Sequence, residues 1–458
     1  MNAVSVVGSG LTGTLFACAM AQAGHSVVLY ERRPDPRRVA QPAGRSINLA
    51  LSARGLYALE QIGLKDKVLE QALPMRGRMI HDLKGQTNFQ AYGSKPHEYI
   101  NSISRIYLNQ VLMDAADAVG VQTHFEQRCT GMDFEKRQAY FVDDPTGHPY
   151  HIDQTPLIAA DGAGSALRKS LIQRIRVNYS QDYLEHGYKE LTIPPAAHGE
   201  FALDPGALHI WPRQSFMLIA LPNPDRSFTC TLFLAFEANP DMPGFDQLQS
   251  DSAILNFFES YFADIIPIVP DLIEQFKHNP IGALATVRTA PWFVDNQLLL
   301  LGDAAHAIVP FFGQGMNAGF EDVSVFMKLL SESGSDWESL FQRFYQQRKG
   351  DADAIADLAL ENFIEMRDRV NDPEFILHKQ VGLELERRYP EIFIPKYSLV
   401  SFHRVPYSVA YQHGELQKQL LKTLCQHCDQ IEQINWDHAS ELIAQFQQSA
   451  PLLNKGLI

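Results

Sequence analysis

This chain of 458 residues has few cysteines, and its basic residues are outnumbered by acidic ones. The five cysteines are odd in number and widely scattered, which argues against a disulfide framework and indicates reduced thiols. A formal net charge of −14 disfavours non-specific binding to nucleic acid or to anionic lipid. The composition therefore predicts a cytoplasmic globular protein that has no nucleic-acid partner.

Long apolar runs are also missing. No stretch reaches the ~18 uncharged residues that a membrane-spanning helix requires. The chain opens on a short strand, Val4 to Val7, where a signal peptide would have basic residues and then a longer apolar segment. Its C-terminal residues are rich in Gln, Glu and Asp. We therefore expect neither a signal peptide nor a membrane anchor.

Several catalytic signatures are absent as well. The sequence contains no HExxH metal motif, no G-x-S-x-G nucleophile motif and no second glycine-rich dinucleotide motif. We therefore expect no catalytic side-chain nucleophile and no metal site. Cys425 and Cys428 form one C-x-x-C without a second pair. Two reduced thiols are the favoured interpretation, and metal or redox use is the alternative.

One glycine-rich turn is present, Gly8-Ser9-Gly10-Leu11-Thr12-Gly13, directly after the first strand. A helix of small and apolar residues follows, and the strand Ser26–Tyr30 then ends at Glu31. Such a unit directs backbone N–H groups at a pyrophosphate, and the acid accepts hydrogen bonds from ribose hydroxyls. Because a carboxylate repels a 2′-phosphate, the unit predicts FAD or NAD rather than NADP. The alternative is a simple tight turn.

A second motif, Gly302-Asp303, ends the apolar run Leu298–Leu301 and precedes Gly313-Gln314-Gly315-Met316-Asn317 at the start of a helix. The strand places Asp303 where α/β sheets bind ligands, and the helix directs N–H groups at an anionic ring edge. A third motif is Asp161-Gly162-Ala163-Gly164-Ser165-Ala166-Leu167-Arg168. Taken alone, its Asp161 is equally well explained as a helix N-cap.

These patterns predict an α/β fold: a Rossmann-type FAD-binding domain with an inserted antiparallel-sheet substrate domain and a C-terminal helical region. The most strand-like segment, 186–236, supplies the inserted sheet, and the chain is mainly helical from about 317 onward. The expected limits are 1–73 with 104–178 and 286–330 for the FAD-binding domain, 74–103 with 179–285 for the substrate domain, and 331–458 for the helical region.

In order and spacing, the three motifs resemble those of the class A FAD-dependent aromatic hydroxylases, in which the Asp of the second motif contacts the FAD ribityl chain. Longer stretches look like the kynurenine 3-monooxygenase family of that class, and the likeness extends from residue 4 to about residue 410. These stretches are 44–51, 75–81, 186–191, 208–212 and 311–317.

The resemblance implies NADPH- and O2-dependent hydroxylation of L-kynurenine to 3-hydroxy-L-kynurenine through a flavin C4a-hydroperoxide. This reaction belongs to tryptophan degradation by the kynurenine pathway, with NAD or quinolinate synthesis as a destination. The cofactor carries the chemistry, while the protein orients the ring and excludes water. NADPH would bind only transiently, which agrees with the single dinucleotide motif. The oligomeric state is left open, with a homodimer as one alternative.

The same resemblance implies that Arg78 binds the substrate carboxylate, assisted by Tyr92 and Tyr397, with Asn362 nearby. Each residue also has a plainer interpretation: a solvent-facing strand arginine, two partly buried tyrosines, and a helix asparagine with a local partner. The helix that carries Asn362 should also bring Glu361, Glu365 and Arg369 to the domain interface. FAD contacts are expected at Gly8, Gly10, Thr12, Gly13, Tyr30, Glu31, Arg32, Arg33, Ala50, Arg105, Cys129, Asp303, Gly315, Met316 and Asn317.

Two features depart from the family. Phe312 stands where some bacterial relatives carry His, which leaves the role of that position open, and we expect no C-terminal anchor like that of the eukaryotic members. Two rival functions also remain. A hydroxylase acting on a phenol would need a base and no carboxylate-binding arginine. A flavoprotein scaffold would use the helical tail 371–458 to bind a partner. NADPH oxidation with and without kynurenine separates kynurenine hydroxylation, phenol hydroxylation and the scaffold function.

Overall fold

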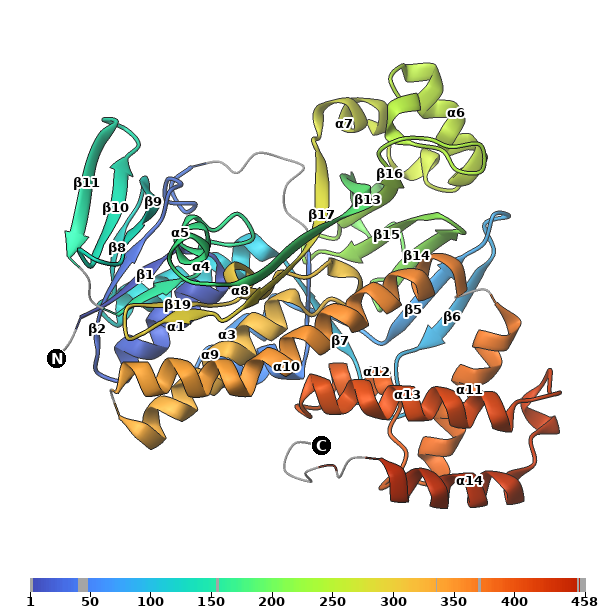
Figure 1. The fold of residues 1–458 in the computed structure, drawn as a ribbon. Helices are drawn as coiled ribbons and strands as arrows, with labels where there is room; N and C mark the ends of the chain where they lie inside the picture. The colour runs from blue at the N-terminus through green and yellow to red at the C-terminus, as the bar shows by residue number, and fades with distance from the viewer. Residues whose placement is uncertain are drawn as a thin grey trace.

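A computed structural model describes residues 3–39, 48–153, 156–334, 336–369, 372–450 and 453. Residues 44–47 of the stretch 44–51 lie outside the described residues. Figure 1 shows a sheet with flanking helices around the N-terminus, a second sheet beside it, and a group of C-terminal helices below the second sheet. The α/β architecture expected from the sequence is confirmed.

The first sheet has six strands, and its strands are parallel except for β18 at one edge. Its central strands are mostly apolar and buried, as is typical of parallel strands covered on both faces. The small side chains of α1 (Leu11–Gln22) let it pack against both α4 (Arg105–Ala118) and α9 (Gly315–Ser333). The strand order is β18 (Phe293–Val294), β19 (Leu298–Leu300), β12 (Leu157–Ala159), β1 (Ala3–Val7), β2 (Ser26–Tyr30), β8 (Gln122–His124).

The second sheet has seven strands and is antiparallel, as expected, except for one pair. The exception is β5 beside β14, which run parallel. These two strands lie far apart in the chain, so no hairpin turn imposes an antiparallel pairing. The strand order is β17 (Ile281–Ala290), β13 (Asn178–Ile193), β16 (Phe228–Ala235), β15 (Phe216–Pro222), β14 (Ala207–Arg213), β5 (Gly77–His81), β6 (Thr87–Ala91).

Alternation along these strands divides their side chains between two cores. Ile210 and Met217 face a core shared with the C-terminal helices, whereas Trp211 and Leu218 face α6 (Asp251–Tyr261) and α7 (Leu272–His278). The strands of this sheet fall within 74–103 and 179–285, apart from the outer ends of β13 and β17. The domain limits themselves remain a prediction.

The remaining strands of the described residues form two small sheets. One joins β3 (Leu49–Leu51), β7 (Ile100–Ile103) and β4 (Leu73–Met75), and the other joins β11 (His148–Asp153), β10 (Gln138–Asp143) and β9 (Gln127–Asp133). Between β3 and β4 the chain forms two helices, α2 (Ala53–Gln61) and α3 (Lys65–Leu69). They are separate because Gly63 adopts a left-handed conformation with φ of +74°.

The chain is mainly helical beyond residue 315, as predicted. The long helix α10 (Trp337–Ile364) starts in the core of the first sheet and ends in the core of the second, and it carries Asn362 near that second end. The segment η5 (Glu365–Arg369) continues it, and the helices α11 (Pro373–Arg388), α12 (Lys396–Ser401), α13 (Tyr407–Leu424) and α14 (Trp436–Ser449) follow.

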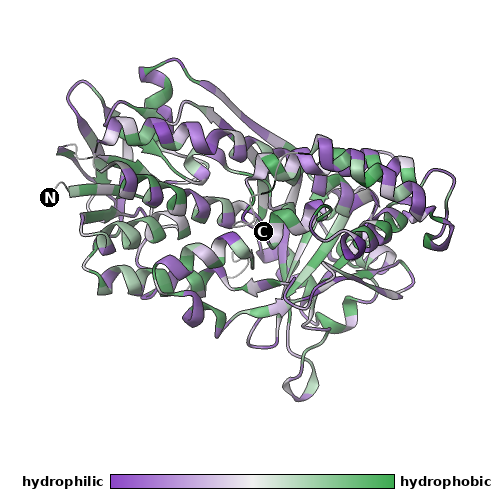
Figure 2. Ribbon diagram, turned by 90° about the horizontal axis from the view of Figure 1, so that it is seen from below, coloured by the Kyte–Doolittle hydropathy of each residue, from purple (hydrophilic) through white to green (hydrophobic). Residues whose placement is uncertain are grey.

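Seen from below in Figure 2, these helices carry hydrophilic and hydrophobic residues along their whole length. Among the described residues, no helix has the length and apolar character needed to cross a membrane. Cys425 and Cys428 are free thiols, and burial raises the pKa of Cys425 to about 12.

A buried histidine pair lies on the side of the second sheet that faces α6 and α7. The Nε2 atom of His209 lies 2.8 Å from the carbonyl oxygen of Asp204, to which it must donate. Its Nδ1 atom lies 2.8 Å from Nε2 of His81 and therefore accepts. His81 in turn contacts Asp264 at 3.3 Å and stacks on Trp211.

This pair makes stability depend on pH. Burial lowers the pKa of His209 to about 4, while a histidine in an unfolded chain titrates near 6.5. Below about pH 6.5 the unfolded chain gains a proton that the folded chain refuses, so stability falls as the pH drops towards 4. We expect this group to remove about 2 kcal/mol from the free energy of unfolding between pH 7 and pH 5.

Urea unfolding at both pH values measures this effect. His209→Gln should lose less stability over that range than the wild type, whereas the exposed control His148→Gln should match the wild type. Equal pH dependence in His209→Gln and the wild type would contradict the assignment.

Candidate active site

One cavity of about 610 Å³ lies between the two sheets and the C-terminal helices. All but two of the predicted site residues line it, the exceptions being Gly13 and Asn317. The predicted residues that line it are Gly8, Gly10, Thr12, Tyr30, Glu31, Arg32, Arg33, Ala50, Arg105, Cys129, Asp303, Gly315 and Met316, together with Arg78, Tyr92, Asn362 and Tyr397. The nucleotide motifs and the expected substrate residues therefore share one cavity.

At one end of the cavity, the glycine-rich turn brings backbone close to backbone. Gly8 has a φ of +104°, and a Cβ atom there would lie 2.3 Å from the carbonyl oxygen of Ala160. A Cβ atom on Gly13 would lie 2.0 Å from the carbonyl oxygen of Gly8, so Gly13 lets α1 start tightly against β1. The space in front of the helix start is thereby kept open for a pyrophosphate, as the motif requires. A direct contact of Gly13 with FAD remains a prediction.

Glu31 is buried at the end of β2, with 4% of its surface exposed. Its Oε2 atom accepts hydrogen bonds from the backbone N–H of Ser9 at 2.9 Å and from the Ser9 hydroxyl at 3.0 Å. Its Oε1 atom accepts from the backbone N–H and from Nε of Arg33, both at 2.9 Å. Burial alone would raise the pKa of Glu31, but Arg33 and the N–H groups hold it below its usual range. An ionised acceptor at this place suits ribose hydroxyls.

The second motif forms another wall. Gly302 takes a φ of +58° and directs the chain into the short helix α8 (Asp303–His306), which puts Asp303 on the cavity. Gly315 and Met316 begin α9 and also line the cavity. Asn317 lies behind them: its Oδ1 accepts from the N–H of Ser52 at 3.0 Å, and its Nδ2 donates to the carbonyl of Ala50 at 2.8 Å. Asn317 holds the lining loops together, and a direct contact with FAD remains a prediction.

Asp161 supports the start of a helix without being its N-cap. Its Oδ2 atom accepts from the N–H of Ala166 at 2.8 Å, the first residue of α5 (Ala166–Arg174), whose N-cap is Ser165. The residue also lines the cavity, where its Oδ1 atom is buried without a hydrogen-bond partner. Burial raises the pKa of Asp161. Arg168 donates to the carbonyls of Ala163 and Ala304 and so joins the second and third motifs.

These observations show that the residues suit FAD. The glycine turn has space only for backbone, an ionised acceptor stands at the end of β2, and a buried carboxylate oxygen without a partner lines the cavity. Two helix starts, those of α1 and α9, face the same space.

At the other end of the cavity, Arg78 on β5 has 4% of its surface exposed, so the interpretation as a solvent-facing arginine is wrong. Its Nη1 atom donates to Oε1 of Glu365 at 3.3 Å, whereas its Nε atom is buried without a hydrogen-bond partner. Its guanidinium lies 5.3 Å from the ring centre of Tyr397 and 5.9 Å from that of Tyr92. Burial alone would lower the pKa of Arg78, but Glu365 keeps it above its usual value.

Glu365 was expected only at a domain interface, and its pairing with Arg78 was missed. The available signal was its position three residues after Asn362, on the same face of the helix. Lys379 on α11 was also missed. Its Nζ atom donates to Oε1 of Gln90, the residue that pairs with Arg78 in the sheet, at 3.4 Å. Burial and then the charge of Arg78 lower the pKa of Lys379 to about 7.

Three aromatic rings are stacked in series beside Arg78. The rings of Tyr92 and Tyr397 lie 5.1 Å apart at 8°, and those of Tyr397 and Phe312 lie 5.4 Å apart at 17°. Tyr397 is therefore held between Tyr92, which directly follows β6, and Phe312, which lies in the loop that precedes α9. This stack gives Phe312 a structural role.

Asn362 lines the cavity and also has local partners. Its Nδ2 atom donates to the carbonyl of Phe311 at 2.6 Å and contacts Sδ of Met366 at 3.3 Å. Phe311 stacks on Phe363 at 4.1 Å and packs on Phe233 at 4.9 Å. This end of the cavity therefore combines one cation with apolar and aromatic walls.

We expect the flavin to be bound without a covalent bond. Among the described residues that line the cavity, Cys129 is the one thiol and no histidine occurs. Burial raises the pKa of Cys129 to about 12, which keeps the thiol protonated and unreactive at neutral pH. Acid precipitation should leave all of the yellow colour in the supernatant. Flavin that stays with the precipitated protein would contradict this expectation.

Comparison with known proteins gives a consistent result. A family described as FAD binding domain matches residues 1–359. A kynurenine 3-monooxygenase of Myxococcus xanthus is 47% identical over 96% of this chain and 95% of its own length. One from Stenotrophomonas maltophilia is 42% identical over 99% of this chain and 98% of its own length.

A likeness to solved structures supports the fold. A tetrameric form of 2-methyl-3-hydroxypyridine-5-carboxylic acid oxygenase is similar with a TM-score of 0.65. The match covers 83% of this chain and 96% of the oxygenase, at 19% sequence identity. At that identity the likeness concerns the fold alone.

Proposed function

The chain belongs to the FAD-dependent kynurenine 3-monooxygenase family, and we propose that it converts L-kynurenine to 3-hydroxy-L-kynurenine with NADPH and O2. The observation that carries this proposal is the buried Arg78 in the cavity that the nucleotide motifs also line. Kynurenine is an aromatic amino acid, so its α-carboxylate needs a cation inside a chain of net charge −14. Arg78 would supply that cation.

The chain's own residues bind and orient the substrate. The planar fork of Arg78 offers a carboxylate two parallel hydrogen bonds, one of them from the Nε atom that lacks a partner. The hydroxyl of Tyr92 is likewise buried without a partner and is available to the same carboxylate. The hydrogen bonds of Asn362 use its amide nitrogen, which leaves its amide oxygen to accept from the substrate amine.

The substrate ring would lie against the apolar part of the wall, formed by Leu208, Ile219, Leu221, Phe233 and Phe311. Bound FAD would take electrons from NADPH and activate O2 for transfer of one oxygen atom to the ring. The protein excludes water from this space and keeps the ring in place, which limits the wasteful release of peroxide. Within metabolism, the activity belongs to tryptophan degradation, with NAD or quinolinate synthesis as a destination.

The test is NADPH oxidation by the purified protein without an added substrate, with L-kynurenine, and with 4-hydroxybenzoate as a representative phenol. We expect strong stimulation by L-kynurenine alone, and mass spectrometry should show one added oxygen atom at the ring position ortho to the amine. Stimulation by the phenol in place of kynurenine would favour the phenol hydroxylase. If neither compound stimulates NADPH oxidation, the non-catalytic flavoprotein scaffold becomes the favoured function.

A further inference from the structure

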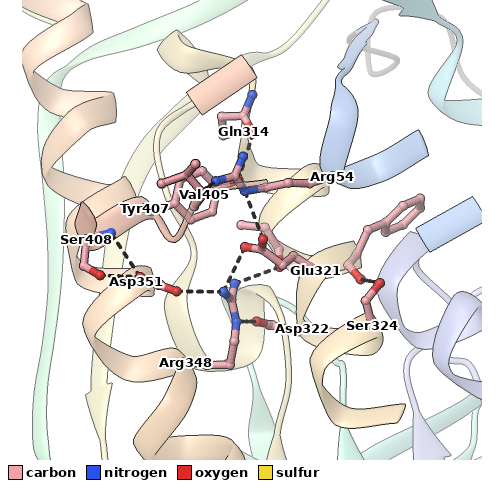
Figure 3. A network of polar contacts seen from close by, with 12 residues as sticks. Arg54, Gln314, Glu321, Asp322, Ser324, Arg348, Asp351, Val405, Tyr407 and Ser408 are labelled. Carbon is pink, nitrogen blue, oxygen red and sulfur yellow. Dashed lines mark hydrogen bonds and ion pairs between the residues drawn. The ribbon is translucent and has the colours of Figure 1, made fainter. Parts of the chain in front are cut away.

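Arg54 is a fully buried arginine on α2 that is absent from the cavity lining. Its guanidinium is surrounded by backbone carbonyls: Nη1 donates to Val400 at 2.7 Å and to His403 at 2.5 Å, and Nη2 donates to Val405. Figure 3 shows the side chain extended towards Val405 and the ring of Tyr407. The guanidinium carbon lies 3.9 Å from the centre of that ring.

The three carbonyls lie at the end of α12 and in the turn that follows it. The last carbonyls of any helix lack donors within the helix, and α12 is only six residues long. Arg54 supplies a donor for one of them, the carbonyl of Val400, and donors for the carbonyls of His403 and Val405 in the turn. At the other end of α12, the N–H of Lys396 donates to Oε1 of Gln417 at 2.8 Å. Arg54 and Gln417 thus bond backbone groups at both ends of the helix that carries Tyr397.

The opposite side of Arg54 faces the flavin-binding part of the chain. Its Nε atom lies 3.0 Å from Oε1 of Glu321 on α9, the helix whose first residues line the cavity. Arg348 binds Glu321 at 2.8 Å and Asp322 at 2.9 Å. Asp322 also accepts from the N–H of Gly302 at 3.1 Å, next to Asp303. Figure 3 shows Arg54, Glu321, Arg348 and Asp322 as one connected network.

A second connection runs through Tyr407. Its hydroxyl donates to Oε1 of Gln314, the residue before α9, at 2.8 Å. Nε2 of Gln314 donates to the hydroxyl of Ser52 at 3.3 Å, two residues before Arg54. The turn between α12 and α13, the loop before α9 and the start of α2 thus contact one another around the Arg54 guanidinium.

We propose that Arg54 is a positioning residue for the substrate: it fixes α12 to the flavin-binding helix α9 and thereby holds Tyr397 against Arg78. A lysine could not replace it, because a point charge cannot reach three carbonyls and a carboxylate at once. Arg54 does not line the cavity, so its effect on the substrate is indirect, and we assign that effect to Tyr397 on α12. The identity of the substrate in this inference rests on the proposed function, whereas the role of Arg54 in holding α12 is independent of it.

The first experiment needs no substrate. Amide hydrogen exchange is measured on the FAD-loaded wild type, Arg54→Met and the control Arg404→Met. Arg404 lies in the same turn and stacks over Tyr57 of α2 at 3.6 Å, so it is a matched cation on the same pair of elements. We expect about tenfold faster exchange or more in the segment 397–405 of Arg54→Met alone, because its carbonyls lose their donors. Wild-type exchange there would overturn the proposal.

The second experiment is a double-mutant cycle with Tyr397→Ala, in which L-kynurenine binding is followed by the flavin spectrum. Arg54→Met should weaken binding by about tenfold or more in the wild-type background and by less than about twofold in the Tyr397→Ala background. An equal loss in both backgrounds would show that Arg54 does not act through Tyr397, and would overturn the proposal.

If Arg54→Met does not fold, Arg54→Lys decides the question in both experiments. Wild-type exchange together with wild-type affinity in Arg54→Lys would overturn the proposal, and a partial loss of both would support it. A wild type that fails to bind kynurenine would contradict the proposed function, and the exchange experiment would still decide the role of Arg54.

Discussion

Replacing Arg78 by methionine should weaken L-kynurenine binding by roughly ten- to a thousandfold and leave the FAD content unchanged. A hydrogen bond to a charged group contributes about 1.5–3 kcal/mol, and leaving the substrate charge unpaired in a dry site can raise the cost to about 2–5 kcal/mol. At about 1.4 kcal/mol per decade, these costs give the expected range. Methionine keeps the apolar stem of the side chain and removes the guanidinium that donates two parallel hydrogen bonds.

The structure shows that the Glu365 carboxylate would compete with the substrate for Arg78. Arg78 is paired with Glu365, so a substrate carboxylate must share or replace that contact. In Arg78→Met, the Glu365 carboxylate would remain near the site and repel the substrate, which adds to the loss. Arg78→Lys should recover only part of it, because a point charge cannot reproduce the fork.

A titration of the flavin spectrum with L-kynurenine at fixed salt measures these affinities. The matched control is Arg76→Met: Arg76 lies two residues earlier, is exposed, and donates to the carbonyl of Pro96 at 2.9 Å outside the cavity lining. It should bind kynurenine as the wild type does. Unchanged affinity in Arg78→Met would remove Arg78 from the site, and with it the best reason to prefer kynurenine over a phenol.

The nucleotide end of the site could be predicted from the sequence because its determinants are local. A strand, a glycine turn, a helix and an acid such as Glu31 follow one another within a short stretch, and each has a conformational requirement that limits the residue types. The apolar run that ends at Gly302-Asp303 is equally local. The structure places both Glu31 and Asp303 on one cavity.

The substrate end could not be derived in that way. Arg78, Asn362 and Tyr397 lie far apart in the chain, and only the resemblance to a family indicated that they belong together. Their local patterns favoured plainer interpretations, and the one given to Arg78 is wrong because the sheet and the C-terminal helices bury it. Asn362 has both a local partner and a place on the cavity.

Arg54 shows where sequence reasoning ends. It stands near the start of an ordinary helix, with nothing around it to suggest that carbonyls some 350 residues later depend on it. Three of its partners are backbone carbonyls, which leave no trace in the residue types at Val400, His403 and Val405. Such a contact exists only once α2, α9 and α12 have packed together.

Replacing Glu31 by lysine should strip FAD from the protein. The wild-type carboxylate is ionised and buried, and it also orders the turn through Ser9 and Arg33. Lysine removes the acceptor for ribose hydroxyls and places a cation beside Arg33. With one charged hydrogen bond contributing about 1.5–3 kcal/mol, and like-charge repulsion added, we expect FAD affinity to fall by at least about a hundredfold.

Glu31→Gln isolates the charge from the shape, since the amide keeps one acceptor oxygen and removes the ion pair with Arg33. It should fall between Glu31→Lys and the wild type. The matched control is Glu126→Lys, which makes the same charge change at an exposed residue whose N–H donates to the carbonyl of Arg33. Because Glu126 does not line the cavity, this control should keep its flavin.

The measurement is the ratio of flavin to protein absorbance after gel filtration, with circular dichroism to confirm that each variant is folded. Since Arg33 and the N–H groups hold the pKa of Glu31 below its usual range, the carboxylate stays ionised as the pH falls from 8 to 5. Wild-type flavin retention should therefore be level across that range, with any loss through Glu31 confined to more acidic solutions. Full retention by Glu31→Lys would mean that the ribose does not lie at the end of β2, and the strand, turn and helix would then have to be explained by packing alone.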